Sequence, residues 1–136
     1  MTGDDFHFRF GGIERLYGRR ALEHFRHAHI AIVGLGGVGS WAAEALARSG
    51  VGTLTLIDMD DICVSNTNRQ LHALSGQYGR TKTDAMADRL RSINPEGDIR
   101  VHFGFLNTKN VDELITSEMS GVVDAIDSVK AKAGLI

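Results

Sequence analysis

The chain has 136 residues, the size of one ordinary domain, and its 43% hydrophobic content with a single proline suits a globular core. Its formal net charge of −2 gives no composition-level indication of binding to nucleic acid or to an anionic membrane. A single cysteine excludes a disulfide within the chain, and neither a signal peptide nor an apolar run of about 18 residues is found, so we expect a cytoplasmic protein without membrane contact.

The first segment is expected to be helical. Residues 1–8 are polar with scattered aromatic side chains, and we expect them to be loosely held. Residues 13–25 carry apolar residues at helical spacing, and Gly18 is expected to bend or break this helix. Its arginines either form a solvated face or include one that reaches a phosphate. The sequence thus predicts an N-terminal helical segment over residues 1–28, before a nucleotide-binding domain over residues 29–136.

A glycine-rich stretch follows. Residues 30–33 form a short apolar, β-branched run typical of a buried parallel strand, and a helix is expected over residues 38–50, with Trp41 in the core. Between them, glycines at G-x-G-x-x-G spacing let the backbone turn tightly and let a phosphate approach the first N–H groups of the helix. The expected phosphate-binding residues are Gly34, Gly36, Gly37 and Gly39.

The second strand is expected over residues 53–58. Asp58 ends it, about 20 residues after the last glycine, where a carboxylate is placed to accept hydrogen bonds from ribose hydroxyls. The loop over residues 59–70 is long for a βα loop and rich in polar groups that could contact a ligand. Within it we expect Cys63 to be a small packed thiol rather than a nucleophile, because no neighbour in the sequence would activate it.

A further helix is predicted to open at Lys82 and to end before Pro95, with Met86, Leu90 and Ile93 on one face. A lysine at a helix start opposes the helix dipole, since cations prefer the C-terminal end. This local cost favours a ligand-binding role for Lys82.

The rest of the chain continues the alternation, with a strand over 99–105, a short helix over 111–119 and a strand over 121–126. Alternating helices and strands predict an α/β fold with a Rossmann-like parallel sheet and helices on both faces. Asp58 and Asp127 would then both follow strand ends and meet at one edge of the sheet, where ligands bind in such folds.

Five motifs of the sequence are similar to those of a known group of enzymes. In chain order they are Gly34-Leu-Gly-Gly-Val-Gly39, Asp58-Met-Asp60, Ser65-Asn-Thr-Asn-Arg-Gln70, Lys82 and Ala125-Ile-Asp127. Together they resemble the adenylating domain of the ubiquitin-activating-enzyme superfamily, a ThiF-like group that includes bacterial adenylyltransferases of thiamine and molybdopterin synthesis. The Asn-x-Asn-Arg-Gln stretch is the most specific of them.

A closer resemblance, to the tRNA threonylcarbamoyladenosine dehydratase branch, rests on residues 9–18, 37–48, 58–70 and 124–132. It covers about residues 9–136, yet only the N-terminal half of that family's adenylating domain. The resemblance implies that ATP activates the threonyl carboxylate of a modified adenosine in tRNA as an acyl-adenylate. An internal nucleophile then displaces AMP and closes a ring, a net dehydration.

Three other functions stay open from the sequence. The chain could instead adenylate the C-terminal carboxylate of a small sulfur-carrier or ubiquitin-like protein. It could be an NAD-dependent oxidoreductase domain, although NAD binding needs none of the residues Arg69, Lys82 and Asp127. It could also be a non-catalytic nucleotide-binding module.

The resemblance also implies roles for individual residues. The glycine backbone would hold the phosphates of ATP and Asp58 the ribose, Arg69 and Lys82 would offset the charge of the triphosphate, and Asp127 would position Mg²⁺. Arg15 matches an arginine that reaches into the partner subunit's site in homodimers of the superfamily, with Arg9 as its rival. The remaining expected nucleotide contacts are Asp60, Asn66, Asn68 and Gln70.

The end of the chain carries one more expectation. The apolar strand over 121–126 needs neighbours on both faces, and the helix expected after it has barely two turns before residue 136. We therefore expect residues 1–136, expressed alone, to be poorly soluble or oligomeric and to turn over no substrate.

Overall fold

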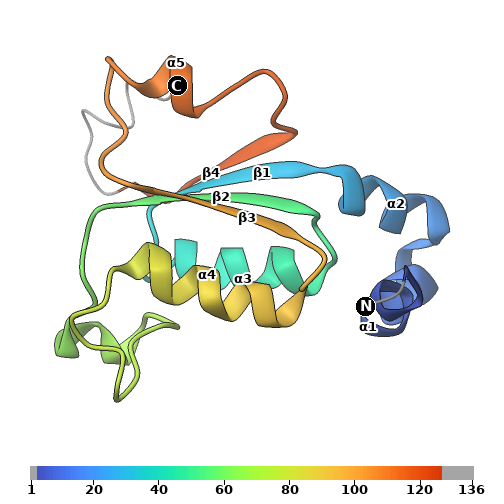
Figure 1. Cartoon of the computed structure of the whole chain (residues 1–136), viewed down its shortest axis with the longest axis horizontal. Coiled ribbons are helices and arrows are strands. Elements are labelled where there is room, and N and C mark those ends of the chain that lie inside the picture. The colour runs from blue at the N-terminus through green and yellow to red at the C-terminus, as the bar shows by residue number, and fades with distance from the viewer. Residues whose placement is uncertain (1–2, 127–136) are drawn as a thin grey trace.

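The computed structural model describes residues 3–126, which form a four-stranded parallel sheet with helices on both faces (Figure 1). This confirms the predicted α/β, Rossmann-like architecture. The elements are α1 (Gly3–Tyr17), α2 (Arg19–His27), β1 (His29–Val33), α3 (Gly39–Arg48), β2 (Thr53–Asp58), the 3₁₀ helix η1 (Val64–Asn68), α4 (Lys82–Ile93), β3 (Asp98–Phe103), α5 (Val111–Leu114) and β4 (Gly121–Asp124).

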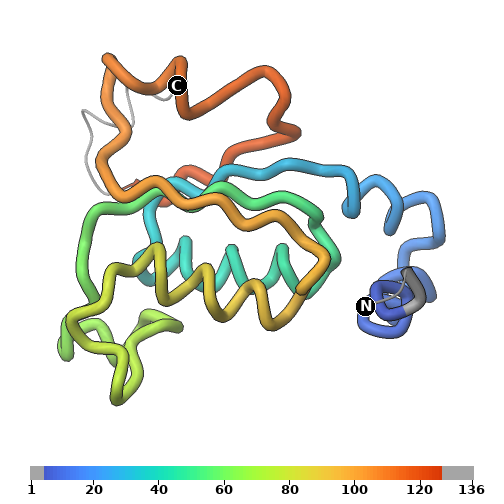
Figure 2. The backbone as a smooth tube through the Cα atoms, viewed as in Figure 1, coloured from blue at the N-terminus to red at the C-terminus, as the bar shows by residue number. Residues whose placement is uncertain are grey.

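The order of the strands is β3-β2-β1-β4, so β1 lies between β2 and β4 (Figure 2). Ile30 of β1 stands opposite Leu54 on one side and Gly121 on the other. The chain moves outward from β1 through β2 to β3, then returns to the other side of β1 for β4. In open α/β sheets, ligands bind beyond the carboxyl ends of the strands where the order reverses, and the glycine stretch after β1 occupies that point.

The main core lies between the sheet and helices α3 and α4, which cover one face (Figure 1). Ile32, Leu54 and Leu56 of the strands pack against these helices. Met86 and Leu90 of α4 are fully buried, as their helical spacing predicted. This packing fixes where α3 and α4 begin, and both begin at the edge that carries the glycine stretch.

The other face of the sheet is covered by the segment after β3. Val33 and Ile57 pack there with Leu106, and Leu114 and Ile115 pack against this cluster. The helix in this segment ends at Leu114 instead of continuing to residue 119, because the backbone at Ile115 is extended. The strand predicted over 121–126 likewise ends at Asp124.

Helices α1 and α2 lie at the opposite end of the sheet from the glycine stretch (Figure 1). Gly18, with φ of 93°, separates them, which confirms the predicted break. Phe6 and Phe10 form a buried cluster with Leu22 and pack over Gly50, in the turn that precedes β2. The expectation that residues 1–8 are loosely held is therefore wrong around Phe6, because this buried side chain anchors α1.

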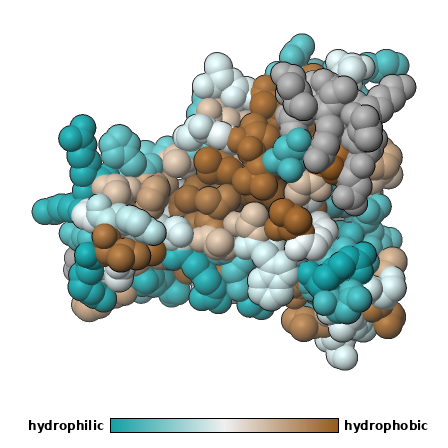
Figure 3. Space-filling model, turned by 180° about the vertical axis from the view of Figure 1, so that it is seen from behind, coloured by the Kyte–Doolittle hydropathy of each residue, from teal (hydrophilic) through white to brown (hydrophobic). Residues whose placement is uncertain are grey.

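The far side of the molecule from the view of Figure 1 carries hydrophobic side chains gathered in the middle of its face (Figure 3). Strand β4 lies on this side, since β3 is nearest the viewer in Figure 1. In the described sheet β4 has β1 as its one neighbour, and Val122 is exposed. Over residues 3–126, no helix has the length and apolar character needed to cross a bilayer.

Candidate functional site

The glycine loop, residues 34–38, joins β1 to α3, and its glycines serve two purposes. At Gly34, where φ is 96°, an added Cβ would lie 2.6 Å from the carbonyl oxygen of Ala125. At Gly39, the first residue of α3, an added Cβ would lie 1.7 Å from the carbonyl oxygen of Gly34. Neither position has room for a side chain. A Cβ on Gly36 or Gly37 would instead face the side chain of Gln70 or Arg69, at 3.7 and 3.4 Å. Those two glycines open toward residues expected around the nucleotide.

Asp58, at the end of β2, holds the glycine loop directly. One of its carboxylate oxygens accepts a hydrogen bond from the N–H of Leu35 at 2.7 Å, and the other accepts from the N–H of Asp60 at 2.8 Å. The predicted ribose ligand is thus already placed beside the first turn of the loop. A carboxylate has about four lone-pair sites, so Asp58 retains capacity for hydroxyl donors.

The turn around η1 positions Arg69. The side-chain oxygen of Asn66 accepts from the N–H of Cys63 at 2.8 Å, which closes the turn. The guanidinium of Arg69 donates to the carbonyl of Ser65 at 3.2 Å and to the side chain of Asn68 at 3.0 Å. Asn66 and Asn68 therefore shape the segment that presents Arg69 beside the glycine loop.

Gln70 is buried next to that loop, with its side-chain nitrogen facing Gly36. Its side-chain oxygen has no hydrogen-bond partner among the residues that the structure describes. A buried amide oxygen without a partner is uncommon in folded proteins and calls for a donor. Gln70 therefore has the hydrogen-bonding capacity expected of a nucleotide contact.

Lys82 is the first residue of α4, at the edge of the sheet that carries the glycine loop, and it is 6% exposed. Its ammonium lies 3.8 Å from the carboxylate of Asp60, too far for a direct hydrogen bond, and its backbone N–H donates to the carbonyl of Asp60 at 3.0 Å. The hydroxyl of Thr81 caps the helix by accepting from the N–H of Asp84 at 3.2 Å. Among residues 3–126 this distant carboxylate is the one ion-pair partner of the Lys82 ammonium, so the ammonium is well suited to an anionic ligand.

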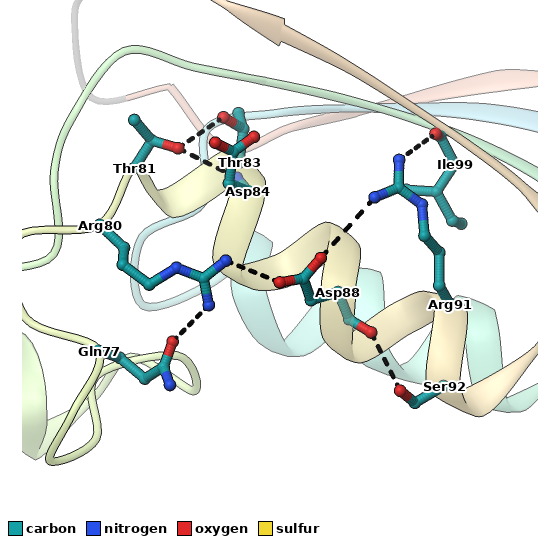
Figure 4. Close-up of polar contacts among 9 residues, drawn as sticks. All are labelled: Gln77, Arg80, Thr81, Thr83, Asp84, Asp88, Arg91, Ser92 and Ile99. Carbon is teal, nitrogen blue, oxygen red and sulfur yellow. Dashed lines mark hydrogen bonds and ion pairs between the residues drawn. The ribbon is translucent and has the colours of Figure 1, made fainter.

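The loop between Arg69 and Lys82 is fastened to the outer side of α4 (Figure 4). The guanidinium of Arg80 donates to the side chain of Gln77 and to the carboxylate of Asp88, both at 2.7 Å. Figure 4 also shows Thr81 capping the helix directly after this anchor. The bonds of Arg80 thus fix the approach of the chain to Lys82.

Arg15, expected at a partner's site, lies in the last turn of α1. Its exposed guanidinium lies beside Gly11 and Gly12 of its own helix and makes no ion pair or hydrogen bond within residues 3–126. Its rival Arg9 pairs with Asp5 at 2.6 Å. Because α1 packs at the other end of the sheet, neither arginine lies at the glycine loop of its own chain.

The predicted Mg²⁺ ligand, Asp127, lies outside the described residues. Within residues 3–126, no group of three or more His, Cys, Asp or Glu side chains comes together that could hold a metal ion. Asp58 is engaged by two N–H groups, and Asp60 faces the Lys82 ammonium. The role of Asp127 stays a prediction.

Three residues of the site were not predicted from the sequence. The hydroxyl of Ser40 donates to the carbonyl of Gly36 at 2.6 Å and accepts from the N–H of Leu71 at 3.3 Å. The indole N–H of Trp41 donates to the carbonyl of Arg69 at 2.9 Å. The third residue, His72, contacts Leu35. Two features of the sequence could have pointed to these residues: a polar side chain in the first turn of α3, and a histidine two positions after Gln70.

Two expectations about side chains are wrong. Trp41 is 52% exposed rather than part of the core, because α3 packs closely on the sheet through Ala43 and Ala47. Cys63 is exposed rather than packed, with its sulfur 3.8 Å from the carbonyl oxygen of Asp61.

Comparison with known protein families decides which group this site belongs to. A model of the ThiF family matches residues 12–135. The chain belongs to the ThiF family. The match covers the glycine loop, the η1 turn and α4, and so includes every part of the site described above. It also confirms the resemblance to adenylating enzymes that the five motifs carry.

Two relatives within the ThiF family are especially similar. The tRNA threonylcarbamoyladenosine dehydratase of Escherichia coli (strain K12) is 56% identical over 136 residues, which are 100% of this chain and 51% of that protein. The enzyme of the same name from Haemophilus influenzae is 53% identical over 133 residues, 98% of this chain and 51% of that protein. The chain thus spans about half the length of these relatives.

A solved structure gives the same result. The crystal structure of the E. coli tRNA N6-threonylcarbamoyladenosine dehydratase TcdA in complex with ATP matches with a TM-score of 0.97 and 55% identity, over 100% of this chain and 56% of that one. The fold of this ThiF-family chain is therefore that of the N-terminal half of an ATP-binding relative.

Proposed function

We propose that this ThiF-family chain binds ATP at the glycine loop and adenylates the threonyl carboxylate of threonylcarbamoyladenosine in tRNA, which then cyclises with net loss of water. The observation that carries the proposal is the presence of two basic residues at this edge of the sheet, Arg69, whose side-chain stem lies beside Gly37, and the buried Lys82 at the start of α4. The names of the similar relatives and the ATP in the matching E. coli structure support it.

The proposed first step forms a bond between a carboxylate oxygen and the α-phosphorus of ATP. The bond from that phosphorus to the bridging oxygen breaks, and pyrophosphate leaves with the electron pair. Catalysis of such a step depends on alignment and charge neutralisation. In this proposal Arg69 and Lys82 offset the charge of the phosphates, Asp58 orients the ribose and the N–H groups of the glycine loop hold the phosphates.

The second step consumes the acyl-adenylate. An internal nucleophile of the modified base attacks the activated carbonyl carbon, AMP leaves, and a ring closes. Mg²⁺ bound with ATP supplies further positive charge at the phosphates, and the residue proposed to hold it is Asp127, since carboxylate oxygens suit this cation.

We further propose a cytoplasmic homodimer in which Arg15 of each subunit serves its partner's site.

Binding tests the nucleotide without requiring turnover. Calorimetric titration of the protein with ATP and Mg²⁺, and separately with NAD, should show tighter binding of ATP. Tighter binding of NAD, independent of Mg²⁺, would overturn the adenylation proposal and favour an oxidoreductase domain.

Pyrophosphate exchange tests the carboxylate that is activated. Measured in an active full-length context, exchange of labelled pyrophosphate into ATP should depend on tRNA that bears threonylcarbamoyladenosine and should be absent with the same tRNA lacking the threonylcarbamoyl group. If exchange depended instead on a small sulfur-carrier or ubiquitin-like protein with a free C-terminal carboxylate, the proposed substrate would be that protein and not tRNA.

A further inference from the structure

Three hydrogen bonds join the glycine loop and α3 to the segment 69–72. Trp41 donates to the carbonyl of Arg69 at 2.9 Å, Ser40 accepts from the N–H of Leu71 at 3.3 Å, and the imidazole Nε2 of His72 lies 2.7 Å from the carbonyl oxygen of Leu35. The segment therefore does not rest on the loop through van der Waals contact alone.

The peptide groups of Leu35 are held from both sides. Its N–H donates to Asp58 at 2.7 Å, and its carbonyl oxygen accepts from His72 at 2.7 Å. Leu35 itself is fully buried, so no water reaches these groups to replace a lost partner. The positions of Gly34 and Gly36, on either side of Leu35, depend on this clamp.

The chemical state of His72 follows from its surroundings. A carbonyl oxygen only accepts hydrogen bonds, so Nε2 carries the proton, and Nδ1 has no partner among residues 3–126. The side chain is 4% exposed, and burial lowers its pKa; the hydrogen bond to Leu35 and the charge of Asp58 oppose this shift, and the charge of Lys82 adds to it. The neutral imidazole is therefore a single donor aimed at Leu35.

We propose that His72 is a positioning residue for the nucleotide, which acts by holding the Arg69–Gln70 segment at a fixed distance from the glycine loop. The inference rests on the proposed binding of ATP at that loop. Without the donor of His72, the carbonyl of Leu35 would be left buried and unpaired, and the loop and the segment would separate until water reached it. Arg69 would then no longer face Gly37.

A matched set of variants separates positioning from mere stabilisation. His72→Leu removes the donor at similar size, and His72→Gln keeps an N–H that can reach Leu35. Ala73→Gly disturbs the next residue, which is equally buried but packs against Ile62 and Ala85 rather than the loop. His72→Met, with a flexible side chain, serves if His72→Leu fails to fold.

The first readout is affinity for ATP, measured by calorimetry at a temperature where every variant is folded. His72→Leu should weaken binding by about tenfold or more, as expected for one buried carbonyl left unpaired, and His72→Gln should recover most of it. Ala73→Gly should lower the thermal midpoint and leave the affinity unchanged. An affinity of His72→Leu or His72→Met within about twofold of wild type, or no recovery in His72→Gln, would overturn the proposal.

The second readout needs no nucleotide. The indole N–H resonance of Trp41, assigned by its loss in Trp41→Phe, reports the hydrogen bond to Arg69. We expect it to shift in His72→Leu and to stay in place in Ala73→Gly, and an unmoved resonance in His72→Leu would contradict the clamp. If wild-type protein bound no ATP, the proposed function would fail, while this resonance would still decide whether His72 holds the segment.

Discussion

At the scale of single residues, Lys82 gives the most direct test of the site. Lys82→Met keeps the length of the side chain and removes its charge, so we expect a folded protein whose affinity for ATP falls roughly ten- to hundredfold, the value of a charge-assisted contact. The exposed Lys109, on the segment after β3, provides the matched control as Lys109→Met. Calorimetric titration of both variants makes the comparison, and equal affinities would remove Lys82 from the site.

The glycines differ from one another in what a methyl group would do. Gly39→Ala would bring a Cβ to within 1.7 Å of the carbonyl oxygen of Gly34, so we expect it to cost at least about 3 kcal/mol or to prevent folding. Gly37→Ala meets the side chain of Arg69 at 3.4 Å, which is ordinary contact. It should fold with little change and weaken the binding of ATP. Urea unfolding and nucleotide titration of the pair test this, and equal stabilities would contradict it.

At the scale of elements, α3 and α4 are tied by Glu44. Arg89 of α4 donates two hydrogen bonds to this carboxylate, which lower its pKa, and Arg48 adds an ion pair at 3.3 Å. A carboxyl group whose pKa is lower in the folded state stabilises the fold above its unfolded pKa. This contribution is lost as the pH falls through the lower, folded value.

We therefore expect Glu44→Gln to be less stable than wild type at neutral pH. The difference should shrink as the pH falls below about 4.3, the ordinary value for a glutamate, and vanish once the folded carboxyl is protonated. Urea unfolding of both proteins from pH 7 down to pH 3 measures it. A difference that stayed constant over this range would show that the pair with Arg89 contributes through packing alone.

The elements also show what the sequence could predict. The bounds of β2 and the start of α4 at Lys82 match the expectations, because alternating and helical hydrophobic patterns are local signals. The bond from Ser40 to Leu71 joins residues 31 positions apart, and that from His72 to Leu35 spans 37. Contacts of this kind depend on how a long loop folds back, which periodicity does not encode. The exposure of Trp41 depends on the same loop.

At the scale of the whole molecule, the position of α1 bears on the proposed dimer. Arg15 lies at the opposite end of the sheet from the glycine loop, so it could serve only a partner's site. If Arg15→Ala and Lys82→Met each abolish pyrophosphate exchange, mixing the two proteins should restore activity, because one site per heterodimer then has both residues. No recovery after verified exchange of subunits would rule out Arg15 as the residue that acts across the dimer and leave Arg9, in the same helix, as the candidate.

The open edge of β4 bears on association in solution. Val122 is exposed on a strand with one neighbour in the described sheet, and such an edge invites pairing with another chain. We expect residues 1–136 to associate at high concentration and Val122→Lys to reduce this association. Val101→Lys, at an exposed position on the other edge strand, is the control. Sedimentation velocity compares them, and equal association of both variants would place the contact elsewhere.

The parallel order of the strands affects how the chain folds during its synthesis on the ribosome. The last residue of β1 is synthesised about 90 residues before β4, its second neighbour, begins at Gly121. At a synthesis rate of about 5–20 residues per second, one side of β1 stays unpaired for roughly 5 to 20 seconds. Closing so long a loop is also slow compared with local pairing. The strand that leads into the glycine loop is thus the last to be enclosed, and nascent chains are most exposed to mispairing there.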